Sequence, residues 1–277
     1  MDRLTKWSDL QDCYRQFPLN PNRRWVFRGH RLADWSLESK LERVAHLRFR
    51  EPYASLRQIE FRLIREFRRH LHRYSGTNID STDELRFMGL MQHHGAPTRL
   101  LDWTYSFFIA LYFAAEEAEP DSESAIWAID LDWCWDRAYD VVPDVMKRIE
   151  ANDKDPEATK TLLAGDRQLV VPLNPFGVDE RLAVQQGLFL VPLDLTVSYM
   201  DNLHGMGADA GRQEHLRKIT IAWQEGSLLR ETLVELQRMN INRRSLFPGL
   251  DGLAKGLENW ITLLPYMPLQ RNRAHSP

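Results

Sequence analysis

The sequence predicts an α+β protein, because strand and helix patterns both occur along the chain without regular alternation. Short runs rich in β-branched and aromatic residues predict strands, and longer stretches with apolar residues at steps of three and four predict helices. Their order does not follow the strand–helix–strand repeat of a parallel sheet. The 277 residues are enough for one large domain or for two ordinary ones.

The composition excludes several classes of protein. Hydrophobic residues make up 43% of the chain, which excludes a disordered protein, and a net charge of −3 argues against a dedicated nucleic-acid clamp. Two cysteines, Cys13 and Cys134, exclude a disulfide scaffold and a metal site built from four thiolates. Because no signal-peptide or membrane-span pattern occurs, we expect a cytoplasmic protein without a membrane partner.

The first half of the chain contains one predicted strand and one strongly amphipathic predicted helix. Residues 24–29 read as a short strand that ends in Gly29. Residues 55–74 read as a helix with Leu56, Ile59, Leu63, Phe67 and Leu71 on its apolar face. The opposite face carries Arg57, Arg62, Arg65, Arg68 and Arg69. These arginines could follow nucleic-acid phosphates, but a solvated charged face is the commoner outcome.

Two further helices are predicted around a polar connector. Ser81 and Glu84 fit a capping box for a helix over 81–93, which Gly95 and Pro97 end. Residues 106–117 have almost no polar face, so this helix should be buried. A strand over 125–131 should follow it in the centre of the sheet.

The second half is predicted to be more varied. Residues 132–165 look like an insertion, strands are expected over 170–173, 188–193 and 218–223, and helices over 227–239 and 251–260. We expect the last helix to lie on the sheet. The predicted organisation is an N-terminal helical extension (1–19), one main domain (20–262) and a tail (263–277).

Three stretches carry side chains that a plain scaffold does not need. Arg28 closes an apolar strand next to Gly29, so a permanent cation lies where the backbone can approach a ligand closely. Its fork suits a phosphate or a ribose edge, although an arginine in this place can also pair with a buried carboxylate.

The second stretch runs from Gln92 to Thr104 and combines polar and aromatic residues between two apolar helices. Asp102, Trp103 and Thr104 directly precede the buried helix, so their side chains can gather at its positive N-terminal end. Capping of this helix by Asp102 or Thr104 is the alternative reading. In the third stretch Gln185 and Gln186 enter a strand, where only one of two neighbours can face a cleft.

Other motifs are missing. The chain has no Walker loop, and Gly205, Gly207 and Gly211 have the wrong spacing for a dinucleotide fingerprint. Adjacent His93 and His94 point about 100° apart on a helix, so we predict no metal site there.

Together these motifs resemble the FRG-domain family. Phe27-Arg28-Gly29 matches its first element, the Gln92-to-Thr104 stretch its long second element, and the Ala110-to-Ala114 and Gln185-to-Phe189 stretches follow. The resemblance covers roughly residues 20–260 and includes the segments 245–248 and 250–253. It identifies the main domain, 20–262, as an FRG domain of the kind that occurs in bacteria and their mobile elements.

A weaker resemblance is to ADP-ribosyltransferases of the arginine–serine–glutamate type. It implies a split β-sheet with flanking helices, with Arg28 in the first motif and Asp102, Trp103 and Thr104 in the second. Gln185 and Gln186 fall near the third motif, where these enzymes have a catalytic glutamate. No glutamate stands there, and Glu180, the nearest, lies outside the predicted strand.

This resemblance implies roles around NAD, taken as a substrate. Arg28, Asp102 and Gln186 would be the catalytic residues. The NAD-binding residues would be Arg28, Gly29, His93, Thr98, Arg99, Trp103 and Thr104, with Trp103 and Thr104 as the floor of the nicotinamide pocket.

The resemblances leave two functions open. The first is an NAD-consuming transferase or hydrolase of bacterial toxin or anti-phage defence type, with an unidentified acceptor. The second is a module with a transferase-like fold that binds a nucleotide or a partner without catalysis.

Overall fold

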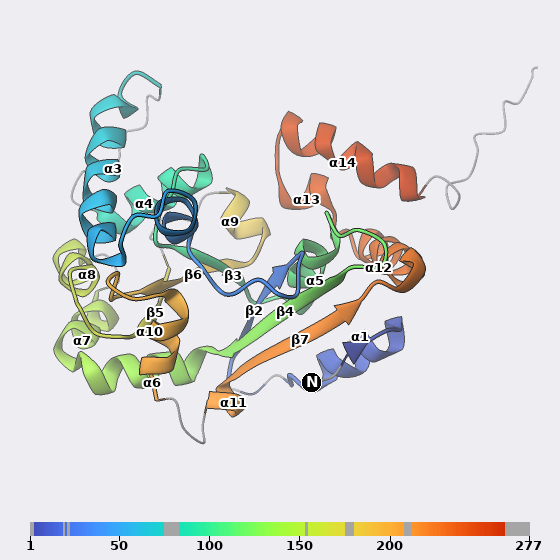
Figure 1. The fold of residues 1–277 in the computed structure, drawn as a ribbon, viewed down its shortest axis with the longest axis horizontal. Helices are drawn as coiled ribbons and strands as arrows, with labels where there is room; N and C mark the ends of the chain where they lie inside the picture. The colour runs from blue at the N-terminus through green and yellow to red at the C-terminus, as the bar shows by residue number, and fades with distance from the viewer. Residues whose placement is uncertain are drawn as a thin grey trace, which may run out of the picture.

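The computed structural model describes residues 3–18, 20, 23–74, 83–152, 155–174, 180–207 and 212–263 (Figure 1). In this part of the chain, seven strands form one sheet in the order β1-β7-β4-β2-β3-β6-β5. Among the described strands, β1 and β7 form the only parallel pair, and all other neighbours are antiparallel. The strands are β1 (Arg3–Leu4), β2 (Trp25–His30), β3 (Leu101–Thr104), β4 (Glu123–Asp130), β5 (Val170–Leu173), β6 (Gly187–Pro192) and β7 (Leu216–Ala222). This mostly antiparallel sheet with many helices confirms the α+β prediction.

Alternation along the central strands divides the core into two layers. Val26 and Ile129 belong to one hydrophobic cluster, whereas their neighbours Phe27 and Ala128 belong to the other. Successive side chains of a strand point to opposite faces, so the two clusters lie on opposite faces of β2 and β4. In β6, by contrast, the successive residues Leu188 to Val191 all belong to the first cluster, which therefore covers both faces at that end of the sheet. Helices cover each face (Figure 1).

The first cluster is packed by helices of the left-hand half in Figure 1. They are α3 (Leu56–Leu71), α4 (Glu84–His93), α6 (Leu131–Val141), α7 (Pro143–Ala151), α8 (Pro156–Leu163), α9 (Glu180–Val184) and α10 (Tyr199–Gly205). A smaller cluster around Leu41 and Leu195 joins this layer to α2 (Lys40–Glu42), η1 (Arg43–Arg48) and η2 (Tyr53–Ser55).

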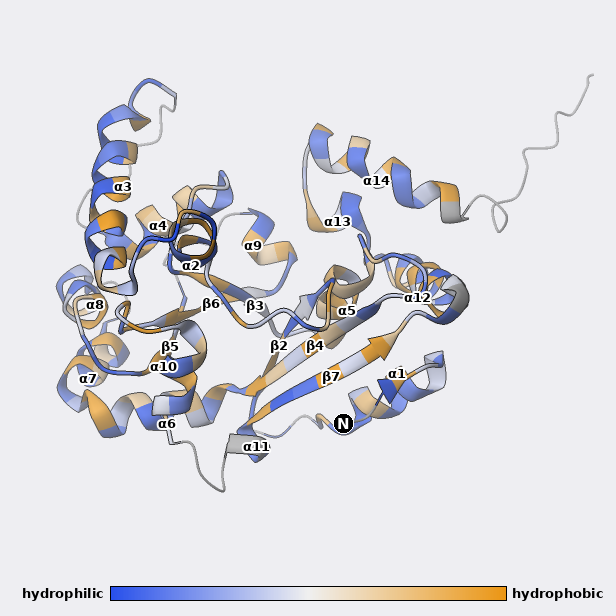
Figure 2. Ribbon diagram, viewed as in Figure 1, coloured by the Kyte–Doolittle hydropathy of each residue, from blue (hydrophilic) through white to orange (hydrophobic). Residues whose placement is uncertain are grey.

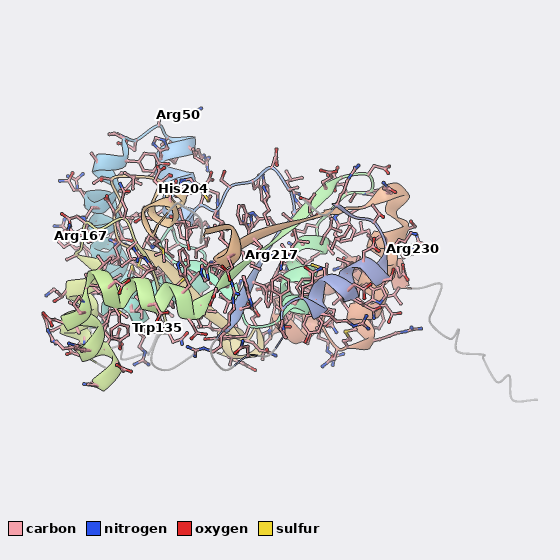
Figure 3. The ribbon with its side chains drawn as sticks, turned by 90° about the horizontal axis from the view of Figure 1, so that it is seen from below. Arg50, Trp135, Arg167, His204, Arg217 and Arg230 are labelled. Atoms are coloured by element: carbon pink, nitrogen blue, oxygen red, sulfur yellow. The ribbon has the colours of Figure 1, made fainter. Side chains whose placement is uncertain are left out.

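The second cluster is packed mainly by α1 (Trp7–Arg15), α5 (Phe107–Ala115), α12 (Ser227–Arg238) and α13 (Arg243–Leu246). Short α11 (Arg212–His215) precedes β7, η3 (Gln224–Gly226) precedes α12, and α14 (Leu250–Leu263) follows α13. In Figure 3, Arg50 after η1 lies at the top left of the molecule and Arg230 of α12 lies at its right.

Most predicted elements are confirmed within a few residues of their expected limits. The helix expected over 106–117 is α5, and its central residues are buried as predicted. The helix expected over 81–93 begins at Glu84, where Asp83 accepts a hydrogen bond from the Arg86 backbone. The predicted capping residue, Ser81, lies outside the described residues.

Residues 132–165 form α6, α7 and α8, apart from the two residues outside the described part. Their apolar side chains are buried, as Cys134, Met146 and Leu162 show. This segment therefore belongs to the first hydrophobic cluster. That it is an insertion stays a prediction.

The N-terminal segment also belongs to the main fold. Its helix is α1, as predicted, and Leu10 and Cys13 of α1 are buried in the second cluster. Before that helix, Arg3 and Leu4 add β1 to the edge of the sheet beside β7.

The prediction that residues 251–260 lie on the sheet is wrong. Helix α14 packs against α12 and α13, and large apolar side chains such as Leu250 and Ile261 are exposed. Hydrophobic and hydrophilic residues alternate along this helix, which stands at the edge of the fold (Figure 2). An apolar helical period indicates one apolar face but does not identify the surface that covers it. The predicted tail beyond residue 263 lies outside the described residues.

Candidate functional site

The sheet opens between β2 and β3. Strand β2 pairs with β4 along its whole length, from Trp25↔Asp130 to His30↔Ala125, but it meets β3 at Phe27↔Thr104 alone. Beyond this point the two strands separate. The FRG motif lies on one side of the opening and the Asp102-Trp103-Thr104 motif on the other (Figure 1).

A cleft of about 1070 Å³ lies over this opening. Its walls come from β2, β3, η1, α9, α13, α14, the end of α5 and the segment between β2 and α2. Ligand pockets commonly measure roughly 300–1,000 Å³, so this cleft has room for a ligand as large as a dinucleotide. Its basic lining residues are Arg28, Arg31, Arg43, Arg48, Arg181, Arg243 and Lys255.

Arg28 bridges the opening. Its Nη1 donates to the main-chain oxygen of Asp102 at 2.6 Å, and its Nε donates to Nε2 of His30 at 3.2 Å. No ion pair joins Arg28 to a carboxylate within the described part of the chain. Burial lowers the pKa of Arg28, although the nearby Asp102 carboxylate opposes this effect. A desolvated guanidinium without an ion-pair partner is suited to hold an anion.

His30 supports Arg28 as a neutral acceptor. Burial, together with the charge of Arg28, lowers the pKa of His30 to about 3. The imidazole therefore remains uncharged at neutral pH and accepts the Arg28 Nε–H on Nε2. This residue belongs to the motif in the sequence, but its role as a partner of Arg28 was not predicted.

Gly29 allows β2 and α5 to come into close contact. A Cβ atom at this position would lie 2.0 Å from the Ala110 oxygen and 2.7 Å from the Ala114 nitrogen. The position of the missing side chain therefore faces α5, although the Gly29 backbone contributes to the cleft wall. The structure thus gives Gly29 a packing role in addition to the predicted place at the ligand.

The second motif supplies three residues to the cleft. Asp102 is exposed, and its Oδ2 accepts from Nε2 of Gln92 at 2.9 Å. Trp103 is buried in the first cluster and contributes to the lining of the cleft. The Thr104 hydroxyl donates to the Gln185 backbone oxygen at 2.7 Å and accepts from the Ser106 backbone. Because this hydroxyl already donates one hydrogen bond and accepts another, Thr104 stabilises the cleft wall more than it offers a contact to a ligand.

Neither Asp102 nor Thr104 caps α5. The N-cap is Ser106, whose side chain accepts from the Ile109 backbone. Asp102 lies within β3, paired with Phe189 of β6.

The structure places the two glutamines differently from the prediction, which put Gln186 at the site. Gln186 is exposed, has a left-handed backbone with φ of 48°, and does not line the cleft. Gln185 lines the cleft instead and donates from Nε2 to the Leu246 oxygen at 2.9 Å. Because β6 begins only at Gly187, the strand alternation assumed for the two glutamines does not apply to them.

Three other predicted ligand residues lie away from the cleft. Arg99 is 3% exposed and contacts both Glu60 carboxylate oxygens through Nε, at 2.9 and 2.8 Å, while its Nη1 donates to the Leu163 oxygen. Thr98 is buried and donates to the Gln92 side chain, so it supports the residue that holds Asp102. His93 ends α4 beside His94 and is outside the cleft lining.

Sequence patterns missed three residues of the cleft, which lie between β2 and α3. Arg43 is close enough to Glu38, Glu42 and Asp102 for their charges to affect its pKa, which burial lowers overall. Trp35 is 45% exposed, with Arg31 over its ring at 5.5 Å. Glu38 is half-buried in the wall. This segment has no helical or strand period, and only its position beside Arg28 indicates a role.

Ion pairs join the cleft residues that follow α5 to those of α13 and α14. Arg243 Nη1 lies 2.7 Å from Glu116 Oε1, and Lys255 of α14 pairs with Glu117. The Arg243 guanidinium also lies 3.8 Å from the Phe247 ring centroid. These contacts neutralise Arg243 and Lys255, and the lining cations outside these ion pairs include Arg28 and Arg43.

The arginine face predicted for α3 is only partly exposed. Arg57 turns inward and donates to the oxygens of Leu163, Gly165 and Leu193, and Arg68 lies 4.8 Å over the Phe87 ring. Arg62, Arg65 and Arg69 remain exposed, with Glu66 between them. Fewer phosphates could be neutralised than the sequence pattern indicates.

The described residues contain neither a cluster of metal ligands nor a helix that could span a membrane. No group of three or more histidine, cysteine, aspartate or glutamate side chains is arranged to hold a metal ion in the part of the chain that the structure covers. Among the described helices, none is long and apolar enough to cross a membrane.

The molecule is thus an α+β protein whose candidate site lies where its sheet opens. The family model of the FRG domain matches residues 23–123, which run from the residue pair before β2 to the first residue of β4. The chain therefore contains an FRG domain, and this domain supplies Arg28 and Asp102 to the cleft. No curated protein and no solved structure matches the chain.

Proposed function

We propose that the cleft binds NAD and that the protein breaks the bond between nicotinamide and ribose, as ADP-ribosyltransferases and NAD hydrolases do. The observation that carries this proposal is the position of Arg28 at the opening between β2 and β3, without a carboxylate ion-pair partner among the described residues. A split in a sheet with an arginine at its edge is also what the resemblance to ADP-ribosyltransferases implies.

The cleft offers a partner for each chemical part of NAD. Arg28 and Arg43 would bind the pyrophosphate, because a guanidinium fork matches phosphate oxygens. The exposed ring of Trp35 would stack on a base, and Trp103 would form the floor under nicotinamide. The Asp102 carboxylate would accept hydrogen bonds from ribose hydroxyls, while Gln92 and Thr98 keep its orientation.

Bond cleavage requires stabilisation of positive charge on the ribose. The nicotinamide nitrogen takes the bonding electron pair, and an oxocarbenium ion remains at the ribose carbon until a nucleophile adds. A carboxylate close to this carbon would stabilise the transition state electrostatically. Asp102 is the motif carboxylate in the position to do so.

A second function is binding of a nucleotide or partner without turnover. It is favoured by Gln185, which lies in the cleft just before β6. The ADP-ribosyltransferases that the sequence resembles have a catalytic glutamate near this place. An amide can hydrogen-bond a ribose hydroxyl but carries no charge for catalysis.

Nicotinamide release distinguishes the two functions. The purified protein is incubated with NAD, and free nicotinamide is followed by chromatography. We expect release by the wild type, a decrease of at least about tenfold in Arg28→Ala and in Asp102→Asn, and no change in the control Arg65→Ala on the exposed face of α3. Saturable NAD binding without release would contradict the enzyme and support the second function.

A toxin or defence role extends the enzymatic proposal. An enzyme that consumes NAD depletes a cofactor that every cell needs. We expect expression in a bacterial host to slow growth and Arg28→Ala to restore it. Growth inhibition that persists in the Arg28→Ala protein would contradict this role.

A further inference from the structure

We propose that Glu38 is the general base of the cleft, the carboxylate that takes the proton from the attacking nucleophile. This inference rests on the proposed function and assigns the carboxylate that the third motif lacks. The carboxylates that line the cleft in the described part of the chain are Asp34, Glu38, Asp102, Glu116 and Glu117.

Most of these carboxylates already have partners. Glu116 accepts from Arg243 at 2.7 Å and from the Tyr112 hydroxyl at 2.9 Å. Glu117 pairs with Lys255, which lowers the pKa of Glu117. The Asp102 carboxylate accepts the Gln92 amide. Carboxylates held in this way are poor proton acceptors, because their lone pairs already stabilise another group.

The Glu38 carboxylate differs from them. It has no hydrogen bond or ion pair with another described residue, and it is half-buried, whereas Asp34 is exposed. Burial raises the pKa of Glu38, and Arg43 opposes this rise. A raised pKa makes the carboxylate a stronger base.

The backbone around Glu38 is fixed. Its neighbours Leu37 and Ser39 are buried, and the Ser39 hydroxyl accepts from the Glu42 backbone at 3.1 Å as the cap of α2. Arg43 Nη1 donates to the Glu38 main-chain oxygen at 2.7 Å. Arg43 also lies within electrostatic range of Arg28 and Asp102, which places Glu38 beside the proposed NAD-binding residues.

The proposed step balances with water or an acceptor hydroxyl as nucleophile. The carbon–nitrogen bond breaks and its electron pair leaves on nicotinamide, which becomes neutral. The nucleophile oxygen forms a bond to the ribose carbon and releases one proton to Glu38. The products are nicotinamide and ADP-ribose, free or attached to the acceptor, and the proton passes from Glu38 to solvent.

The substitution Glu38→Gln tests this role, because glutamine keeps the size of the side chain and removes its basicity. We expect nicotinamide release to fall by about 10²-fold or more, with NAD binding by titration calorimetry retained within about threefold. The matched control is Glu51→Gln, an exposed glutamate after η1, which should release nicotinamide at the wild-type rate.

The pH profile gives a second readout, because it reports the titration of the base itself. In the wild type, kcat/KM should fall on the acid side as one group becomes protonated, and Glu38→Asp should keep this limb while Glu38→Gln loses it. Wild-type release that survives Glu38→Gln within about threefold would overturn the role of Glu38 and leave the proposed function intact. No release by the wild type would overturn the enzymatic function and this role with it.

Discussion

The guanidinium groups of Arg28 and Arg99 lie in two regions of the molecule that differ in the partners they offer to a positive charge. Arg99 contacts both carboxylate oxygens of Glu60, and the pair is buried between α3 and the segment before β3. Arg28 contacts a neutral imidazole and a main-chain oxygen and borders an open cleft. An internal carboxylate therefore satisfies the charge of Arg99, whereas the charge of Arg28 remains available to a ligand.

Substitution at Arg99 should have the largest effect on stability. We expect Arg99→Met to lower the free energy of unfolding by about 3–5 kcal/mol, because it leaves the Glu60 carboxylate buried without its partner. Urea denaturation measures this change. The double variant Glu60→Met with Arg99→Met should lose much less than the sum of the single substitutions, and a loss below about 1 kcal/mol in Arg99→Met would contradict the structural role.

Substitution at Gly29 should be the next largest. The added methyl group of Gly29→Ala would overlap the α5 backbone, so we expect a loss of about 1–3 kcal/mol in the free energy of unfolding. Gly89 of α4 is the matched control, since a Cβ there meets only the Phe189 ring at 3.6 Å. Gly89→Ala should stabilise the protein by about 0.5–1 kcal/mol, and equal effects at both sites would contradict the close packing of β2 on α5.

Substitution at Arg28 should change stability least among the charged residues compared. Burial lowers the pKa of Arg28, which means that the fold disfavours its charge. We therefore expect Arg28→Met to change the free energy of unfolding by less than about 1 kcal/mol, measured by urea denaturation beside Arg99→Met. A loss as large as that of Arg99→Met would show that Arg28 serves the fold and not a ligand.

At neutral pH the smallest expected effect on stability is that of His30 protonation, and this effect grows as the pH falls. His30 has a pKa of about 3 in the folded protein and an ordinary value of 6.5, so the unfolded chain binds more protons between these values. His30 therefore lowers stability progressively as the pH falls below about 6.5, by at most about 1.4 kcal/mol per pH unit.

Two variants separate this effect from other titrations. His30→Gln should flatten the acid limb of a stability–pH curve. Arg28→Met should raise the pKa of His30, because the neighbouring positive charge is removed, and a histidine NMR titration can follow this shift. A His30 imidazole that titrates near 6.5 in the wild type would contradict the buried neutral state.

The sequence was sufficient to predict which motifs meet but not how each residue acts. Arg28, Asp102, Trp103 and Thr104 reach one cleft as expected, because each motif lies next to an apolar strand or helix that the residue pattern identifies. Periodicity cannot reveal tertiary partners. Arg99 stands in the same motif as Asp102, yet its partner Glu60 comes from a helix 39 residues earlier in the chain.

Two further differences have local causes. The sequence pattern predicts that both glutamines lie in a strand. In the structure the chain turns at Gln186, which has a left-handed backbone, before β6 begins, and this turn places Gln185 at the cleft. Trp35, Glu38 and Arg43 were missed because a non-repetitive segment gives no pattern from which the direction of a side chain follows. Only the tertiary structure shows that this segment forms a wall of the cleft.

The central claim is that the charge of Arg28 is available to an anionic ligand in the cleft. Isothermal titration of NAD into the wild type, Arg28→Met and Arg65→Ala tests it most directly. The claim predicts saturable binding by the wild type and by Arg65→Ala, and an affinity at least about tenfold lower in Arg28→Met, since a guanidinium–phosphate contact contributes about 1.5–3 kcal/mol. Equal affinity of Arg28→Met and the wild type, or no binding by either, would contradict it.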